Sequence, residues 1–361
     1  MTRYARAATM EGPFSRSPVL DPINITVVGG AGIVGREFLK ILDERQLPVG
    51  RLRLLATSRS AGKQVEFRGN TITIEETTEG SFDGKDDIVF LSASGSASKL
   101  YAPIAAEKGA LVIDDSSAFR MDETVPLVIP EINAADLAWH QGIISQPNCT
   151  TTPMALALFP IHQVNPLKRI VVATYQAVAG AGAAAIEGLK TETAAALEGR
   201  HEPSGTQKKE IAFNAVPQVD DFSDDGYTKE ELKMANETRK IFHAPELAIS
   251  ATCVRIPAMF GHSAAIWAEF ERPIDPRAAR TLIDQTEAVT VIDDPEHERY
   301  PTPLDAAGKD QVFVGRIRQD LSNPGGLTLW AVTDSIRKGA ATNVAQLIEE
   351  CDSRGLIKRK G

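Results

Sequence analysis

A cysteine in a polar setting is the clearest candidate for chemistry in this 361-residue chain. Cys149 lies in the segment QPNCTTTP, and the apolar run Met154–Phe159 that follows it is typical of a helix. The start of a helix lowers the pKa of a thiol and offers free N–H groups to an oxyanion. We therefore predict that Cys149 is a nucleophile for acyl transfer. Cys253 and Cys351 lie in apolar runs and are expected to be core residues.

His262 is the candidate general acid or base. It follows the loop segment IPAMFG and precedes an apolar strand, so its ring can reach a site at the strand's edge. A structural role is the alternative, because a single histidine between apolar segments is usually structural. The five other histidines have no metal-ligand spacing, and we predict no metal site.

A glycine-rich turn lies near the N-terminus, in the segment INITVVGGAGIVGREFL. Gly29, Gly30, Gly32 and Gly35 fit both G-x-G-x-x-G and its G-x-x-G-x-x-G variant, between a predicted strand and a predicted helix. Such a turn lets backbone N–H groups approach a pyrophosphate at the helix N-terminus. We predict a dinucleotide site; a turn needed only for packing is the alternative.

The end of the next predicted strand favours NADP over NAD. An NAD enzyme places an acidic residue there to bind the ribose 2′-hydroxyl. This chain has Thr57, Ser58, Arg59 and Ser60, with Lys63 close behind. Hydroxyl groups and a guanidinium suit a 2′-phosphate.

Further charged residues could bind a small anionic substrate. Thr228 and Glu231 form a capping box, which leaves Glu230 free, three residues before Lys233 on one helical face. An ordinary ion pair within the helix is the alternative. Arg255 lies in an otherwise apolar strand, where a buried guanidinium needs an anion, either a substrate carboxylate or an internal acidic partner.

Two kinds of element pattern must position these residues. Before Cys149, short apolar strands alternate with helices, which indicates a Rossmann-type doubly wound parallel sheet. After it, longer strands and segregated helices indicate an α+β catalytic and dimerisation domain with a mixed, mostly antiparallel sheet. The predicted strands are 23–28, 52–57, 88–91, 111–114, 170–174, 252–256 and 264–270, and the predicted helices are 34–42, 100–108, 184–197, 230–242 and one through 340–351.

We place the NADP-binding domain at residues 23–150 and the catalytic domain at 151–337, with a loop at 198–227. The helix in 338–361 is expected to return to the first domain. Residues 1–22 are expected to form a disordered tail, with a transit peptide as the alternative. The net charge of −9 argues against nucleic-acid binding, and no apolar stretch is long enough to span a membrane. Three cysteines without disulfide or zinc spacing suggest a reducing compartment such as the cytoplasm.

From Ile23 almost to its C-terminus the chain resembles the aspartate-semialdehyde dehydrogenase family. The similar segments, in order, are VVGGAGIVG, DDSSAFRMD, PNCTT, TYQAVAGAG, EELKMANETRKI, CVRIPAMFGHS and DSIRKGAATNVAQ. The resemblance implies NADP-dependent reductive dephosphorylation of L-4-aspartyl phosphate to L-aspartate 4-semialdehyde, in the biosynthesis of lysine, threonine, methionine and isoleucine. It also implies a homodimer or homotetramer whose subunits meet through the second domain.

The resemblance implies a role for each matching residue. Cys149 is the acyl acceptor, His262 the acid/base, and Gln176 orients the thioester carbonyl. Arg255 binds the substrate carboxylate and Glu230 its amino group. Arg120, Lys233 and Asn148 surround the phosphate. The residues implied to contact NADP(H) are Gly29, Ala31, Gly32, Ile33, Val34, Gly35, Thr57, Ser58, Arg59, Ser60, Ala179, Gly180 and Asn343.

Three other functions remain possible on the sequence. An N-acetyl-γ-glutamyl-phosphate reductase is the nearest, but its substrate has an uncharged acetylated amine, which would leave a buried Glu230 unpaired. A Cys–His thiol hydrolase would not need the glycine turn. A non-catalytic NADPH-binding regulator would not need Cys149.

Overall fold

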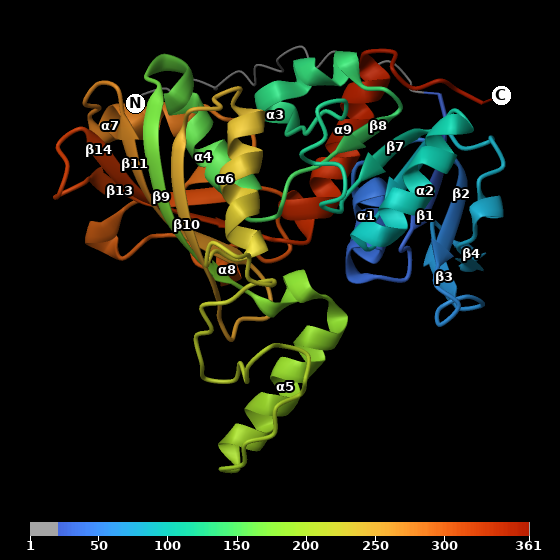
Figure 1. Ribbon diagram of the computed structural model, residues 1–361, viewed down its shortest axis with the longest axis horizontal. Helices are drawn as coiled ribbons and strands as arrows, with labels where there is room; N and C mark the ends of the chain where they lie inside the picture. The colour runs from blue at the N-terminus through green and yellow to red at the C-terminus, as the bar shows by residue number, and fades with distance from the viewer. Residues whose placement is uncertain (1–20, 361) are drawn as a thin grey trace, which may run out of the picture.

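Two six-stranded sheets lie side by side and form the frame of the protein (Figure 1). The computed structural model describes residues 21–360, so the tail predicted at residues 1–22 falls almost wholly outside the described part. Within that part, no helix is long and apolar enough to cross a membrane. The two sheets confirm the predicted fold class, a Rossmann-type parallel sheet joined to a second domain with a mixed sheet.

The first sheet is parallel throughout, as its continuously apolar strands predict. Its faces are covered by helices: α1 (Ile33–Glu44) and α9 (Thr342–Ser353) pack on one face, and α2 (Gly95–Glu107) packs on the other. The C-terminal helix therefore packs on the first sheet. In spatial order the strands are β5 (Glu75–Glu76), β2 (Val49–Ala56), β1 (Ile23–Val28), β6 (Ile88–Leu91), β7 (Leu111–Asp114) and β8 (Ile143–Ser145).

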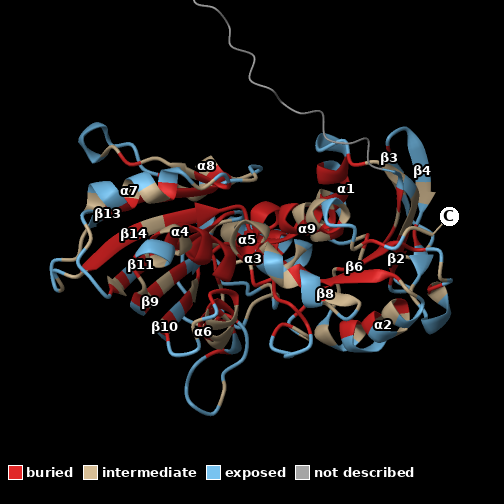
Figure 2. Ribbon diagram, turned by 90° about the horizontal axis from the view of Figure 1, so that it is seen from above, coloured by how far each residue is buried: buried red, intermediate tan, exposed pale blue. Residues whose placement is uncertain are grey.

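The second sheet is mixed, with parallel pairs only at its two edges. One face packs on α4 (Thr151–Val164), α6 (Lys229–Ile241) and α7 (Pro276–Asp284), around the largest apolar core. The interior strands are mostly buried (Figure 2). In spatial order the six strands of this sheet are β10 (Ala248–Arg255), β9 (Leu167–Gln176), β11 (His262–Phe270), β14 (Gly326–Thr333), β13 (Val312–Gln319) and β12 (Val289–Val291).

A helical arm extends from the second sheet. Helix α5 (Ala183–Leu197) projects away from both sheets (Figure 1), and the long predicted loop runs back along it. The buried carboxylate of Glu192 fixes this loop by accepting hydrogen bonds from the backbone of Ser204, Ile211 and Ala212. The remaining elements are the hairpin β3 (Gln64–Phe67) and β4 (Asn70–Thr73), the short helices α3 (Pro130–Asn133) and α8 (Pro303–Ala306), four 3₁₀ turns (Glu79–Ser81, Ala134–Trp139, Val178–Ala181, Pro295–His297) and a π-helix (Arg337–Ala341).

Several elements are longer than the sequence suggested, because polar residues belong to them. Strand β2 begins at Val49 rather than Leu52, and it includes Arg51, whose guanidinium pairs with Asp83 and Asp86. Helix α2 begins five residues early, because the Ser94 side chain caps it. The elements that were not predicted are the strands β3, β4, β5, β8, β12, β13 and β14, the helices α3, α7 and α8, and the π-helix.

Candidate functional site

Cys149 lies where the chain passes from the first sheet to the second. It follows β8 and precedes Thr150, the N-cap of α4. The thiol lies in a cavity of about 240 Å³ between the two sheets, here called the Cys149 cavity. Its lining residues are Ile33, Val34, Asp115, Arg120, Asn148, Cys149, Ala179, Gly180, Gly182, Ser335, Ile336, Gly339 and Ala340.

The environment of Cys149 does not lower its pKa, contrary to the expectation for a helix start. Burial raises the pKa of the thiol to about 12, and the Glu230 carboxylate adds to the rise. The nearby guanidinium groups of Arg120 and Arg255 act in the opposite direction. Desolvation therefore outweighs the helix terminus, and the resting residue is a neutral thiol.

The adjoining ends of three neighbouring strands of the second sheet bring together three predicted site residues. Gln176 ends β9, Arg255 ends the parallel strand β10, and His262 begins the antiparallel strand β11. The register pairs Gln176 with both Arg255 and His262. Gly180 lies between these strand ends and the Cys149 cavity, which it lines. A Cβ on Gly180 would lie 3.1 Å from His262 Nε2 and 3.7 Å from Arg255 Nη1. The sheet register thus assembles one site from residues far apart in sequence.

His262 is buried and uncharged. The backbone N–H of Ala177 donates to its Nδ1 over 3.1 Å, so the neutral imidazole carries its proton on Nε2. Burial, with Arg255 nearby, lowers the pKa of His262 to about 3. The ring therefore presents an N–H group at the nitrogen that faces Gly180.

Arg255 is buried without an acidic partner. Its Nη1 donates to the carbonyl of Ala177 over 2.7 Å, and its Nε has no hydrogen-bond partner. Among residues 21–360 no carboxylate forms an ion pair with it. Burial lowers the pKa of the guanidinium. The internal partner considered from the sequence is not found in the described chain, which leaves this cation free for an anionic ligand.

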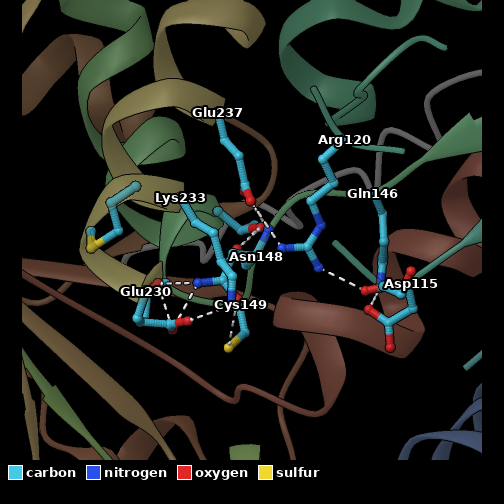
Figure 3. A network of polar contacts seen from close by, with 12 residues as sticks. Asp115, Arg120, Gln146, Asn148, Cys149, Glu230, Lys233 and Glu237 are labelled. Carbon is cyan, nitrogen blue, oxygen red and sulfur yellow. Dashed lines mark hydrogen bonds and ion pairs between the residues drawn. The ribbon is translucent and has the colours of Figure 1, made fainter. Parts of the chain in front are cut away.

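Glu230 is the centre of a buried polar network at the start of α6 (Figure 3). Its Oε1 accepts from Asn148 Nδ2 at 2.7 Å and from Gln176 Nε2 at 3.1 Å. Lys233 forms the predicted ion pair with Glu230 at 3.2 Å and also reaches Asp220 at 2.8 Å. These partners, Lys233 above all, hold the pKa of Glu230 below its usual value despite burial. Thr228 and Glu231 form the expected capping box.

Sequence reasoning missed two charged residues of α6 and one beside the cavity. Glu237 is buried and accepts from Arg120 Nη1 at 2.9 Å. Lys240 donates to the backbone of the Arg120 loop. The carboxylate of Asp115 lines the cavity and contacts Gln146, and burial raises its pKa. The spacing of Glu230, Lys233, Glu237 and Lys240 places them on one helical face, a signal that the sequence offered.

The glycine turn has the shape that a dinucleotide site requires. Gly29 has φ of +89°, and a Cβ there would lie 2.0 Å from the carbonyl oxygen of Ser92. A Cβ on Gly35 would lie 2.5 Å from the carbonyl oxygen of Gly29. No side chain caps Gly32 at the start of α1, so its first N–H groups are available to an anion. Of the cofactor residues implied by the resemblance, Ile33, Val34, Ala179 and Gly180 line the Cys149 cavity.

Two other groups of predicted cofactor residues lie elsewhere. Thr57, Ser58, Arg59 and Ser60 form a turn directly after β2, and Arg59 is exposed. Asn343 is buried and does not line the cavity; its side chain donates to the Val128 carbonyl and accepts from Lys338.

The chain matches two family models, described as the NAD-binding domain of semialdehyde dehydrogenase, over residues 24–140, and its dimerisation domain, over residues 158–338. It is 50% identical over 337 residues to the aspartate-semialdehyde dehydrogenase of Aquifex aeolicus, covering 92% of this chain and 99% of that one. The chain belongs to the aspartate-semialdehyde dehydrogenase family. The Bacillus subtilis member is 46% identical over 343 residues, covering 93% of this chain and 99% of that one.

Solved structures of the family have the same architecture. The aspartate semialdehyde dehydrogenase II of Vibrio cholerae, complexed with ASA, has a TM-score of 0.88 and 43% identity, covering 92% of this chain and 98% of that chain. Family membership confirms the predicted class, an oxidoreductase of amino-acid biosynthesis with a nicotinamide-dinucleotide-binding domain. The three other functions considered from the sequence find no support in these comparisons.

Proposed function

We propose that the protein interconverts L-4-aspartyl phosphate and L-aspartate 4-semialdehyde with NADP(H), through a thioester on Cys149. Two buried guanidinium groups beside one thiol support this proposal. Arg120 and Arg255 each have a buried Nε without a partner, and both act on the charge of Cys149. A substrate with a phosphate at one end and a carboxylate at the other needs two such cations around the attacked carbon.

In the biosynthetic direction the sulfur of Cys149 attacks the acyl carbon of aspartyl phosphate. The sulfur–carbon bond forms, the bond from that carbon to the phosphate oxygen breaks, and the departing phosphate takes up the thiol proton and leaves beside Arg120 and Lys233. Bound NADPH would supply the hydride that reduces the thioester. The Nε2–H of His262 is available to donate its proton to the oxygen of the reduced carbon and to recover it as the carbonyl re-forms and the carbon–sulfur bond breaks. The released thiolate then takes up a proton from solvent.

The remaining residues bind and orient the substrate. Arg255 binds the α-carboxylate, and Glu230 binds the ammonium group. Asn148 Nδ2 and Gln176 Nε2 now donate to Glu230, and the substrate's ammonium group would replace them there, freeing both amides for phosphate and acyl oxygens. The glycine turn and α1 would hold the pyrophosphate of the cofactor, with Ala179 and Gly180 near the nicotinamide and Asn343 behind it.

We infer a preference for NADP from the turn after β2. Arg59 is exposed there, and the segment from Thr57 to Lys63 contains no acidic residue. A guanidinium among hydroxyl groups suits a 2′-phosphate.

We further propose a homodimer formed through the second sheet, which belongs to the segment that matches the dimerisation-domain model. The face of this sheet opposite the α4 core carries two partly exposed aromatic residues on adjacent strands, Tyr175 on β9 and Trp267 on β11, four positions apart in the strand register. A second copy of the chain would cover them.

An absorbance assay tests the activity: wild-type protein with aspartate semialdehyde and inorganic phosphate should reduce NADP, and should do so faster than NAD. Cys149→Ser should bind NADP normally but lose turnover by roughly three or more powers of ten, because the hydroxyl is a far weaker nucleophile and leaving group.

An N-acetylated semialdehyde should be a poor substrate. Cys149→Ser with near wild-type turnover, or reduction independent of phosphate, would contradict the proposal.

A further inference from the structure

Helix α6 carries two charged residues that the proposed reaction does not use. Glu237 and Lys240 follow Glu230 and Lys233 on the same face of the helix, with alternating charge. The side chain of Glu237 is 1% exposed. Burying a carboxylate costs free energy unless hydrogen bonds or ion pairs satisfy its oxygens, so the partners of Glu237 indicate its role.

Glu237 connects the proposed phosphate ligand to the nucleophile. One oxygen accepts from Arg120 Nη1 at 2.9 Å, and the other accepts from the backbone N–H of Asn148 at 2.7 Å. Asn148 directly precedes Cys149, and Figure 3 shows Glu237 beside both partners. The second terminal nitrogen of Arg120 donates to the Asp115 carbonyl at 2.7 Å, so both ends of the guanidinium are held. Among the described residues, the Nε of Arg120 has no hydrogen-bond partner.

Lys240 fixes the same loop through its backbone. Its Nζ donates to the carbonyl oxygens of Arg120, Asp122 and Val125, at 2.8, 2.7 and 2.8 Å. Three carbonyls around one ammonium group fold residues 120–125 over the end of α6. Helix α6 therefore holds Arg120 at two points, by its side chain and by its backbone.

We propose that Glu237 and Lys240 are positioning residues that pre-organise Arg120 against Cys149 for phosphate. This inference rests on the proposed function, in which Arg120 binds phosphate. A guanidinium held at both terminal nitrogens loses little conformational freedom when an anion binds to its free N–H. We call the contacts of Glu237 and Lys240 with Arg120 the Arg120 clamp. In the proposed function other residues bind the cofactor and the α-carboxylate of the substrate, so the clamp affects the binding of phosphate.

Glu237→Gln provides a sharp test, because a glutamine has one acceptor where two donors must be satisfied. Its NH₂ group would face either Arg120 or the Asn148 N–H, so one of these contacts is lost. We expect the KM for inorganic phosphate to rise about tenfold or more, the loss typical of a hydrogen bond to a charged group. The KM values for NADP and aspartate semialdehyde should change by less than about twofold.

Matched controls separate position from charge. Glu246→Gln removes the same charge from an exposed position just after α6 and should leave all three KM values unchanged. Lys240→Met should raise the phosphate KM as Glu237→Gln does, with Lys229→Met at the exposed start of α6 as its control. If Glu237→Gln does not fold, Lys240→Met is judged by the same criterion.

The outcomes distinguish this inference from the proposed function. Wild-type protein without phosphate-dependent NADP reduction would overturn both. Active wild-type protein would overturn only the clamp if the variants had an unchanged or lower phosphate KM, or if all three KM values rose together.

Discussion

At the scale of single residues, burial and a neighbouring carboxylate keep the Cys149 thiol protonated in the protein without substrate. Burial and the Glu230 carboxylate both raise the pKa of Cys149, and Glu230 is also the proposed partner of the substrate's ammonium group. An ammonium group bound there would cancel the second of these effects. The proposed function thus predicts that substrate binding and thiol ionisation are coupled through one carboxylate.

This coupling predicts how Cys149 reacts with iodoacetamide, a neutral reagent. With a pKa of about 12, the thiolate fraction and the alkylation rate should rise about tenfold per pH unit from pH 7 to 10. Glu230→Gln removes a charge that raises this pKa, so alkylation at a given pH should be about three- to tenfold faster. Mass spectrometry of the peptide that contains residue 149 measures the rate, with Glu246→Gln as control. A rate independent of pH between 7 and 9 would contradict the raised pKa.

At the scale of elements, the buried strands of the first sheet followed from sequence patterns, whereas the π-helix and the strands β12, β13 and β14 of the second sheet did not. Strands β1, β6 and β7 have the predicted bounds, because buried parallel strands are continuously apolar. The π-helix has no comparable sequence pattern, because the ion pairs of Arg337 and Lys338 that hold it are made with residues far away in the sequence. Gly339 in this π-helix packs on Cys149: a Cβ there would lie 2.9 Å from the Cβ of Cys149.

The same contrast applies to the site. Cys149, His262 and the glycine turn are marked by residue type and neighbours, and Arg255 by its charge within an apolar strand. The spacing of Glu237 and Lys240 places them on the helical face of Glu230, but it does not reveal that they contact loop residues more than 100 positions away. The pKa of Cys149 was expected to fall, because the sequence shows a helix start but not the burial around it.

Gly339→Ala tests the π-helix. The added methyl group must displace Cys149 or bend the π-helix, because it meets main-chain and Cβ atoms that cannot rotate away. We expect kcat to fall about tenfold or more and the free energy of unfolding to fall by about 1–3 kcal/mol. Steady-state kinetics and urea unfolding measure these changes. Gly325→Ala, whose methyl group meets only the Asn323 side chain at 3.4 Å, is the control; equal effects from both variants would rule out a specific contact.

At the scale of the whole molecule, two cations of the π-helix join the sheets behind the cavity. Arg337 is nearly buried and pairs with Glu37 at 2.7 Å and with Glu44, both on α1, and with Asp310, just before β13, at 2.8 Å. Lys338 is fully buried and pairs with Glu131 at 2.7 Å. The helix that would receive the cofactor's pyrophosphate is thereby tied to the second sheet.

Arg337→Gln should loosen this connection. We expect the free energy of unfolding to fall by about 2–3 kcal/mol, less than for a fully buried pair because Glu44 and Asp310 keep solvent contact. The KM for NADP should also rise, since α1 is no longer held against the π-helix. Arg354→Gln breaks an exposed pair with Glu350 on α9 and should cost at most about 0.5 kcal/mol. Urea unfolding curves that coincide for the two variants would contradict this role.

The contact between Cys149 and Gly339 also joins two distant points of the chain, one where it leaves the first sheet and one where it returns. Everything between them, the second sheet with its helices and the α5 arm, is an insertion whose two ends touch. Insertions of this kind can be exchanged or enlarged without separating the parts of the host fold. The second sheet with its helices is therefore a single insertion into the first domain, and both of its ends lie beside the sulfur for which we propose the covalent step.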